Sequence, residues 1–156
     1  MGALMSNDAS RTVEFTVEEK VIQLKKKADH NKAEALWSFK IVMLSTLISP
    51  LFVAFGAGDL YGKIIPSVLS LIAAALTAWL QLRKPQNLWK IYRTAQRKIE
   101  NELELYQFKV NEYDSNDAEK KLLLNANNIY LETHSKWVES IPTEKSLSKV
   151  SKQGAK

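Results

Sequence analysis

The chain has 156 residues, of which 46% are hydrophobic and 25% charged, and its formal net charge is +5. This length leaves room for one small folding unit. The absence of cysteine excludes disulfide bonds and thiolate chemistry. His30 and His134 stand alone in the sequence, and no spacing matches a metal site, a phosphate-binding glycine loop or a catalytic constellation. The composition therefore predicts a protein that is not an enzyme and holds no metal or cofactor.

The N-terminal third predicts a helix that runs towards an apolar segment. Residues 1–15 have no clear helical pattern and are expected to be disordered, and nothing in them resembles a cleavable signal. Thr16 and Glu19 have the spacing of a capping box. Apolar residues at helical spacing follow without proline or glycine. We therefore expect a cytoplasmic helix over 16–40 that continues into the apolar segment.

Two uncharged apolar runs, Ile41–Gly58 and Ile64–Leu82, dominate the middle of the sequence. Each has about 18–19 residues, or roughly 27–29 Å as a helix, which matches the ~30 Å hydrocarbon core of a bilayer. The link at 59–63 is so short that the two helices must be antiparallel. The predicted fold is an all-α membrane protein built on a two-span transmembrane hairpin. A soluble four-helix bundle with apolar central helices is the alternative.

Basic residues on both outer flanks predict the orientation of this hairpin. Lysine and arginine precede the first span and follow the second, whereas the short link carries Lys63 balanced by Asp59. The positive-inside rule then places both termini in the cytoplasm and the link outside. The same charges suit anionic lipid head groups, so the lipid bilayer is an expected partner. Nucleic acid is not, because no basic-aromatic binding motif accompanies the charge.

Pro50 interrupts the first span. Proline carries no N–H, so the carbonyl of Thr46 loses its helical partner and a kink is expected there. The kink has two interpretations, a static feature of packing or a hinge used in gating. Small and hydroxyl residues of this span, Ser45, Ser49 and Gly56, favour contact with another helix.

A polar stripe lies on one face of the second span, because its members recur at a spacing of three and four residues. They are Ser67, Ser70, Ala74, Thr77 and Gln81. Such a stripe either lines a water-filled path or forms a tight homo-oligomeric interface. Neither span contains an ionisable residue, which argues against a proton-coupled transporter. Because two helices cannot enclose a path, any conduit would need several copies of the chain around an axis.

After Pro85 the pattern predicts a cytoplasmic αα-hairpin over 86–141. Its first helix has a seam with heptad-like spacing, made of Leu88, Tyr92, Ala95, Ile99, Leu103, Tyr106, Val110 and Tyr113. A turn at 114–117 leads to a second helix with Leu122, Ala126, Ile129, Thr133 and Trp137 on one face. Pro142 ends that helix, and the basic tail 142–156 is expected to be disordered. Packing within one chain and packing between chains remain alternatives.

The order of elements and scattered aromatic positions resemble a known family. The chain has a cytoplasmic helix, a tight two-span hairpin and then Pro85, Trp89, Tyr92, Arg93, Glu102, Tyr106, Tyr113 and Trp137 at family-like spacing. Over about residues 17–140 this pattern resembles the SLATT superfamily of bacterial two-helix membrane proteins. The resemblance implies a pore-forming effector of the bacterial inner membrane in prokaryotic conflict systems, alongside nucleotide-second-messenger synthases or sensor domains.

These observations predict an oligomeric, ion-permeable pore. Pro50 would act as its hinge, the stripe of the second span would line it or hold its subunits together, and the helix after Pro85 would transmit a cytoplasmic signal. A cytoplasmic sensor or a second-messenger-linked partner would supply the trigger. Two alternatives are a membrane-anchored scaffold that recruits a cytoplasmic partner and a regulatory subunit of a larger assembly.

Overall fold

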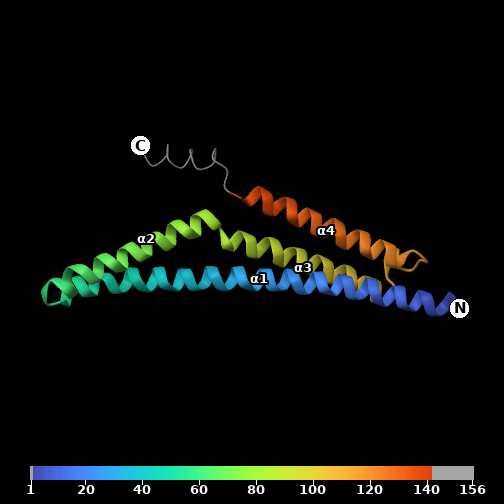
Figure 1. The fold of residues 1–156 in the computed structure, drawn as a ribbon, viewed down its shortest axis with the longest axis horizontal. Helices are drawn as coiled ribbons and strands as arrows, with labels where there is room; N and C mark the ends of the chain where they lie inside the picture. Colours follow the sequence, from blue (N-terminus) through green and yellow to red (C-terminus); the bar gives the residue numbers. More distant parts are fainter. Residues whose placement is uncertain (1, 142–156) are drawn as a thin grey trace. The chain divides into compact units, whose positions relative to one another are not determined.

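The computed structural model describes residues 2–141, with side chains from Ser10 onward, and the described residues contain no β-strand. They form two compact units, one of residues up to His30 with Asn87–Ser140 and one of Asn31–Gln86. The all-α fold is therefore confirmed. The elements are α1 (Gly2–Phe55), the π-helical turn η1 (Leu60–Ile64), α2 (Ile65–Arg83), α3 (Pro85–Gln107), the 3-10 turn η2 (Asn111–Tyr113) and α4 (Ala118–Ser140) (Figure 1).

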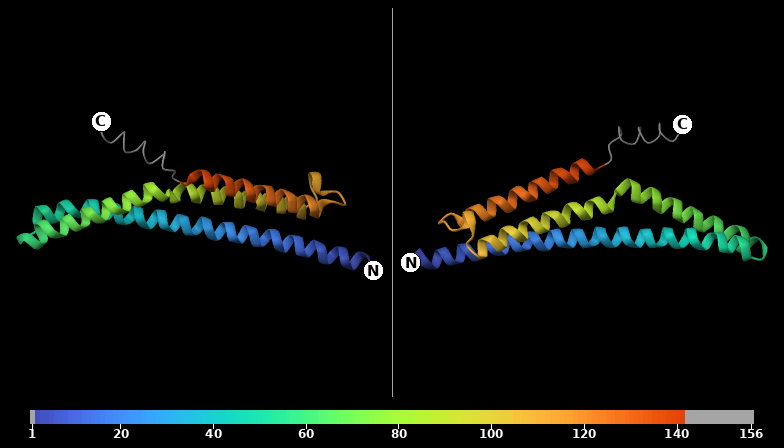
Figure 2. Two further views of the ribbon diagram at one scale, coloured as in Figure 1. Left: turned by 45° about the horizontal axis from the view of Figure 1, so that its top comes forward. Right: turned by 180° about the vertical axis from the view of Figure 1, so that it is seen from behind.

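The first unit, called the three-helix unit below, contains the start of α1 together with α3 and α4. Both views in Figure 2 show α3 and α4 side by side. All three helices contribute to one apolar core. The helices of this unit therefore pack within one chain, and the start of α1 packs against α3 and α4. The buried core residues are Val17, Leu24, Ala95, Ile99, Tyr113, Leu122 and Ala126.

The members of the predicted α3 seam as far as Tyr106 lie on α3 and are buried or half-buried, but its last two members lie off the helix. α3 ends at Gln107 because Lys109 adopts a left-handed φ of 51°. The N–H of Val110 then donates to the carbonyl of Leu105 at 3.0 Å, which closes a Schellman-type helix end. Val110 is exposed, and Tyr113 enters the core from η2 instead.

The expectation of disorder at 1–15 was wrong for the described residues, since α1 begins at Gly2. No capping box forms: the Thr16 hydroxyl donates to the carbonyl of Thr12 at 2.8 Å, and Glu19 accepts a hydrogen bond from Gln23. The helix continues upstream because Val13 packs against the core and no proline interrupts this stretch. The tail 142–156 lies outside the described residues.

The second unit, called the hairpin unit below, contains the rest of α1 with η1 and α2. Its buried seam on α1 has heptad spacing and small or polar side chains, which let two helices approach closely. The Ser49 hydroxyl donates to the carbonyl of Pro66 on α2 at 3.4 Å, as expected for a helix contact. The buried residues on α1 are Asn31, Ala35, Ser38 and Ser45, and those on α2 are Pro66 and Ala73.

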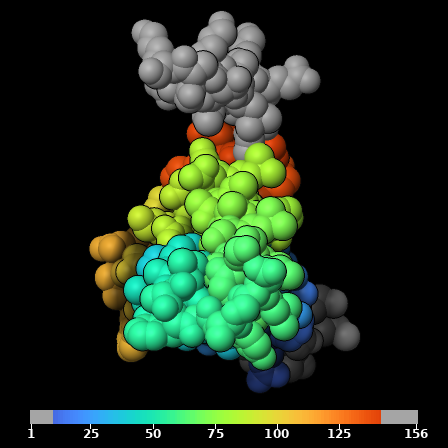
Figure 3. All heavy atoms as spheres, turned by 90° about the vertical axis from the view of Figure 1, so that its left-hand side faces the viewer, coloured from blue at the N-terminus to red at the C-terminus, as the bar shows by residue number. Residues whose placement is uncertain are grey.

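The turn of the hairpin is tighter than the apolar runs suggested. α1 ends at Phe55, and the chain reverses through η1. Figure 3 shows the atoms of this end of the hairpin unit facing the viewer. A Cβ added at Gly56 would lie 2.7 Å from the carbonyl carbon of Tyr61 and 2.8 Å from the nitrogen of Gly62. Glycine is therefore required at position 56 for the close approach of η1 to the end of α1.

Most of the apolar surface of the hairpin unit faces outward. The chain has two helical stretches that are long and apolar enough to cross a membrane. Only 11% of the most apolar 18 residues in each stretch are buried. Core helices of a soluble bundle would be largely buried, and a soluble protein rarely exposes a contiguous apolar surface of this kind. The fold is therefore that of a two-span membrane protein, and the low burial of both apolar stretches disfavours the soluble alternative.

Candidate functional site

The polar stripe predicted on α2 lies on an exposed surface of the hairpin unit. All five members, Ser67, Ser70, Ala74, Thr77 and Gln81, are exposed. Each follows directly after a buried or half-buried residue of α2, so the stripe runs beside the seam with α1 and takes no part in it. The residues in the seam are Pro66, Leu69, Ala73, Leu76 and Leu80.

Two hydroxyls of the stripe donate to the backbone of α2 itself. Ser67 donates to the carbonyl of Lys63 and Thr77 to that of Ala73, both at 2.7 Å. Their oxygens keep lone pairs that can accept hydrogen bonds or contact a cation. Neither the Ser70 hydroxyl nor the Gln81 side-chain amide forms a hydrogen bond within the described residues. An unpaired side-chain amide is costly in hydrocarbon, so these groups favour water or another chain as a neighbour.

A groove of about 460 Å³ on the hairpin unit joins the stripe to the predicted hinge. Ser70 lines it from α2, and Thr46, Ser49 and Pro50 line it from α1, with Val53 and Ala54. Because Pro50 carries no N–H, the carbonyl of Thr46 lacks its usual helical donor. α1 nevertheless continues through Pro50 to Phe55. The groove thus brings together Ser70 of the polar stripe and Pro50, which the sequence suggested separately. The role of Pro50 as a hinge stays a prediction.

An ion pair at the other end of the hairpin unit was not anticipated. Glu34 of α1 accepts a hydrogen bond from the indole of Trp79 at 3.1 Å and lies 3.3 Å from the guanidinium of Arg83. Arg83 also lies over the Trp79 ring. These contacts tie the end of α2 to α1. The spacing of Trp79 and Arg83, one helical turn apart, is the only sequence signal for this cluster.

A polar network anchors η2 inside the three-helix unit. Tyr113 donates to Glu102, and the Asn125 amide donates to Glu102, Glu112 and Tyr113 at 3.0–3.1 Å. Burial raises the pKa of Tyr113, and the hydrogen bond to Glu102 raises it further. The network explains why Tyr113 is buried although it lies off α3.

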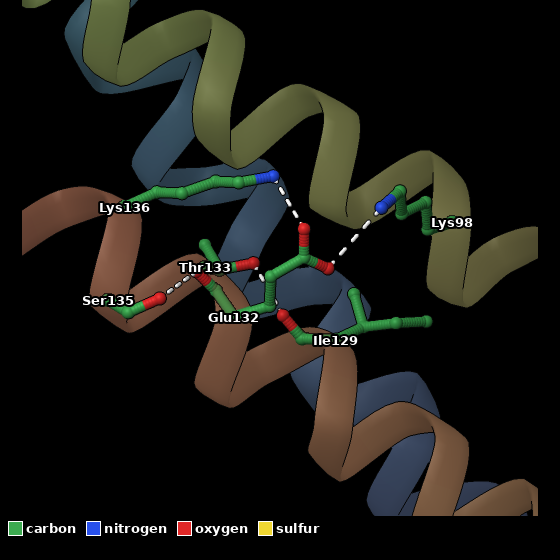
Figure 4. Close-up of polar contacts among 6 residues, drawn as sticks. All are labelled: Lys98, Ile129, Glu132, Thr133, Ser135 and Lys136. Carbon is green, nitrogen blue, oxygen red and sulfur yellow. Dashed lines mark hydrogen bonds and ion pairs between the residues drawn. The ribbon is translucent and has the colours of Figure 1, made fainter.

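On the outer side of the same unit, α3 and α4 are linked by charge. Glu132 accepts a hydrogen bond from Lys136 at 2.6 Å and from Lys98 of α3 at 3.4 Å (Figure 4). The hydrogen bonds from the two lysines lower the pKa of Glu132, that from Lys136 most. All three side chains are exposed, so these ion pairs contribute little to the stability of the unit.

Two of the aromatic positions that carried the family resemblance lie together in the three-helix unit. Tyr92 and Trp137 line a cavity of about 290 Å³ with His134, which stacks on Trp137 at 5.6 Å between ring centroids. The Lys27 ammonium lies 5.7 Å from the centroid of the Tyr92 ring. Burial raises the pKa of Tyr92, and the nearby Tyr130 adds to this rise.

Comparison with known protein families shows the family of this chain. A family described as SMODS and SLOG-associating 2TM effector domain 1, a SLATT family, matches residues 17–137. The chain belongs to the SLATT family. The match spans the three-helix unit and the hairpin unit of this SLATT protein, and it supports a membrane effector role in general terms. Neither a curated protein nor a solved structure matches the chain.

Proposed function

We propose that this SLATT protein forms a homo-oligomeric, gated ion pore in the bacterial inner membrane, with both termini in the cytoplasm. The observation that carries the proposal is the stripe from Ser67 to Gln81, which is polar, exposed and unused by the contact between α1 and α2. Opening such a pore would permeabilise the membrane in a conflict response. It requires no catalytic chemistry and no nucleic acid.

The chemistry of the stripe suits a path for ions. Hydroxyl and amide oxygens can replace part of the hydration shell of an ion without carrying a fixed charge. The neighbouring faces of α2, including Val68 and Ile72, are apolar and exposed, which suits lipid. Several hairpin units arranged about an axis would turn the stripes inward and the apolar faces outward.

Gating would involve the groove at Pro50. Ser70 of the stripe and Pro50 line the same groove, so bending of α1 at Pro50 would change the surroundings of the stripe. α3 begins at Pro85, directly after α2, and would pass on a displacement of the three-helix unit. The family description names association with SMODS and SLOG, which supports a cytoplasmic sensor or a second-messenger-linked partner as the trigger.

The test is ion flux from liposomes that contain the purified full chain. The pore predicts flux from the wild type and a loss of at least tenfold for Ser70→Leu with Thr77→Leu, because leucine would dehydrate the path. The matched control is Val68→Leu with Ala75→Leu, which enlarges two exposed residues on another face of α2 and should leave the flux unchanged. Equal flux from both double variants would contradict a path lined by the stripe.

The alternative function is a membrane-anchored scaffold or regulatory subunit. It is favoured by the three-helix unit having a core of its own, since such a unit could recruit a partner without a pore. On this view neither double variant of α2 changes the cellular phenotype. Substitutions at exposed positions of the three-helix unit would abolish it instead.

A further inference from the structure

We propose that the pore prefers anions over cations, and that Lys84 at its cytoplasmic mouth is the residue that sets this preference. The inference rests on the proposed function, because it names the class of ion that passes along the α2 stripe. It depends on fixed charges at the ends of the stripe and not on the stripe itself, so the pore and its preference can fail separately.

The stripe carries no fixed charge and offers groups that suit both kinds of ion. Ser67 and Thr77 donate their hydroxyl hydrogens to the backbone of α2, so their oxygens face outward as acceptors. Ser70 and Gln81 keep hydrogens that can be donated to an anion. Because acceptors and donors are both present, the sign of the preferred ion depends on charged residues at the two ends of the path.

Both carboxylates of the hairpin unit are paired with a cation. Between residues 31 and 86 the chain has five basic residues and only two acidic ones, Glu34 and Asp59. The carboxylate of Glu34 lies 3.3 Å from the guanidinium of Arg83, and that of Asp59 lies 2.7 Å from the ammonium of Lys63. The charge of each carboxylate is therefore offset by a neighbour within the same chain.

The other three charged residues are lysines at the end of the hairpin unit opposite η1. Lys84 follows the last residue of α2, and Lys32 and Lys40 lie where α1 enters the unit. With both termini in the cytoplasm, this end is the cytoplasmic mouth of the path. The α2 helix dipole adds about half a negative charge there, which is less than one lysine charge. The cytoplasmic mouth is therefore positive, whereas the mouth at η1 is neutral.

Lys84 lies on the line of the stripe. It is three positions after Gln81 and seven after Thr77, and its N–H donates to the carbonyl of Leu80 at 2.9 Å, as in a helix. Its side chain is exposed and forms no hydrogen bond or ion pair within the described residues. The neighbouring Arg83 is instead paired on the α1 side. Lys84 therefore adds one full positive charge per copy to the cytoplasmic mouth.

A ring of such lysines acts on ions through their charge alone. In a pore of several copies, the ring would concentrate chloride at the mouth and repel potassium. The field reaches about 10 Å at roughly 0.1 M salt and only about 3 Å at roughly 1 M. The preference for anions should therefore weaken as the salt concentration rises, whereas a preference set by the neutral lining would persist.

The test is the reversal potential of the full chain in planar bilayers of uncharged lipid, under a gradient of potassium chloride. The wild type should pass chloride over potassium by about threefold or more at roughly 0.1 M salt, and lose most of this preference near 1 M. Lys84→Gln should bring the permeability ratio close to one.

Lys40→Gln is the matched control, because it removes the same charge at the same end of the unit. The Lys40 ammonium lies 5.4 Å from the centroid of the Trp37 ring. On α1, Lys40 shares its face with Leu47 and Leu51, neither of which lines the groove beside Ser70. This variant should keep the permeability ratio of the wild type.

The absence of native cysteine allows a second test after assembly. Lys84→Cys is reconstituted and then modified from the cytoplasmic side with either a cationic or an anionic thiol reagent. The cationic adduct should restore the preference for chloride, and the anionic adduct should reverse it. Because the pore is already assembled, a folding defect cannot produce opposite effects of the two reagents.

The outcomes separate this inference from the pore itself. A preference for potassium in the wild type, an unchanged ratio in Lys84→Gln, or the same ratio with both adducts would overturn the inference and leave the pore standing. A preference that persists near 1 M salt would also contradict the role of Lys84. The absence of any current would contradict the proposed pore, and this inference with it.

Discussion

The fold alters the ionisation of Tyr113. Burial and its hydrogen bond to Glu102 raise its pKa, so the folded chain holds the phenolic proton more tightly than the unfolded chain does. The stabilisation from this group is therefore complete below the ordinary tyrosine pKa of about 10. It is lost as the pH rises from there through the raised pKa.

We predict that the three-helix unit loses stability progressively above about pH 10, and that Tyr113→Phe removes part of this dependence. The measurement is thermal unfolding of the purified chain between pH 8 and 12, followed by circular dichroism, with tyrosine absorbance titrated in parallel. The prediction fails if Tyr113→Phe leaves the alkaline slope unchanged.

Gly56 decides whether the hairpin can turn where it does. In Gly56→Ala the new methyl group would meet backbone atoms of Tyr61 and Gly62 below 3.0 Å, and backbone cannot move aside as a side chain can. We expect a loss of about 1–3 kcal/mol in the free energy of unfolding, as for an overpacked site. Thermal unfolding in detergent measures it.

Gly58→Asn is the control for this prediction. Gly58 has a φ of 80° but no atom within 4 Å of an added Cβ, and asparagine tolerates left-handed backbone better than most residues. The control should cost clearly less than Gly56→Ala. Equal losses would mean that flexibility of the turn matters, and not the close approach at position 56.

At the scale of single residues, sequence spacing predicted the wrong surroundings for Thr16, Glu19 and Tyr113. The Thr16 and Glu19 pair fits a capping box, but the hydroxyl of Thr16 serves the helix interior because α1 extends upstream. Tyr113 continues the spacing of the α3 seam but is buried from η2. Both outcomes depend on partners far along the chain, which spacing alone cannot identify.

At the scale of single elements, α3 gains its stability from its apolar seam. Ile99 is fully buried at the centre of the core, and α1 and α4 supply the other sides of that core. We predict that Ile99→Ala lowers the free energy of unfolding of the three-helix unit by about 2–4 kcal/mol. The measurement is hydrogen exchange of α3 and α4 in the full chain.

Glu104→Ala is the control on the same helix. Its side chain is exposed, and such surface changes usually stay within about 0.5 kcal/mol. If exchange accelerates equally in both variants, the seam is not what holds α3 in place.

The helices themselves were largely predictable. The uncharged runs predicted the two helices of the hairpin, with α2 shifted by one residue, and the predicted seam residues from Leu88 to Tyr106 lie on the buried or half-buried side of α3. The end of α3 was not predictable, because Lys109 adopts a conformation that lysine rarely favours. Ser45 was expected to contact another helix, but its heptad partners Asn31 and Ser38 were missed, because polar residues at core positions do not look like a seam.

At the scale of the whole molecule, the informative surfaces are those that the single chain leaves uncovered. The hairpin unit exposes the α2 stripe, and the three-helix unit exposes apolar outer faces on α1 and α4. The sequence predicted the stripe, since its period is visible in one helix. It could not show which faces stay outside, because burial depends on how the helices pair.

The central claim, that the α2 stripe lines an aqueous path, is tested most directly by cysteine accessibility. Single cysteines replace the stripe residues Ser67, Ser70, Ala74, Thr77 and Gln81, and the comparison positions Val68, Ile72 and Ala75 on the other face of α2. The assembled protein in a bilayer is treated with a charged, membrane-impermeant thiol reagent. A pore predicts labelling that recurs with the stripe and is weak at the comparison positions. Uniformly weak labelling, or labelling of the comparison face, would contradict the account.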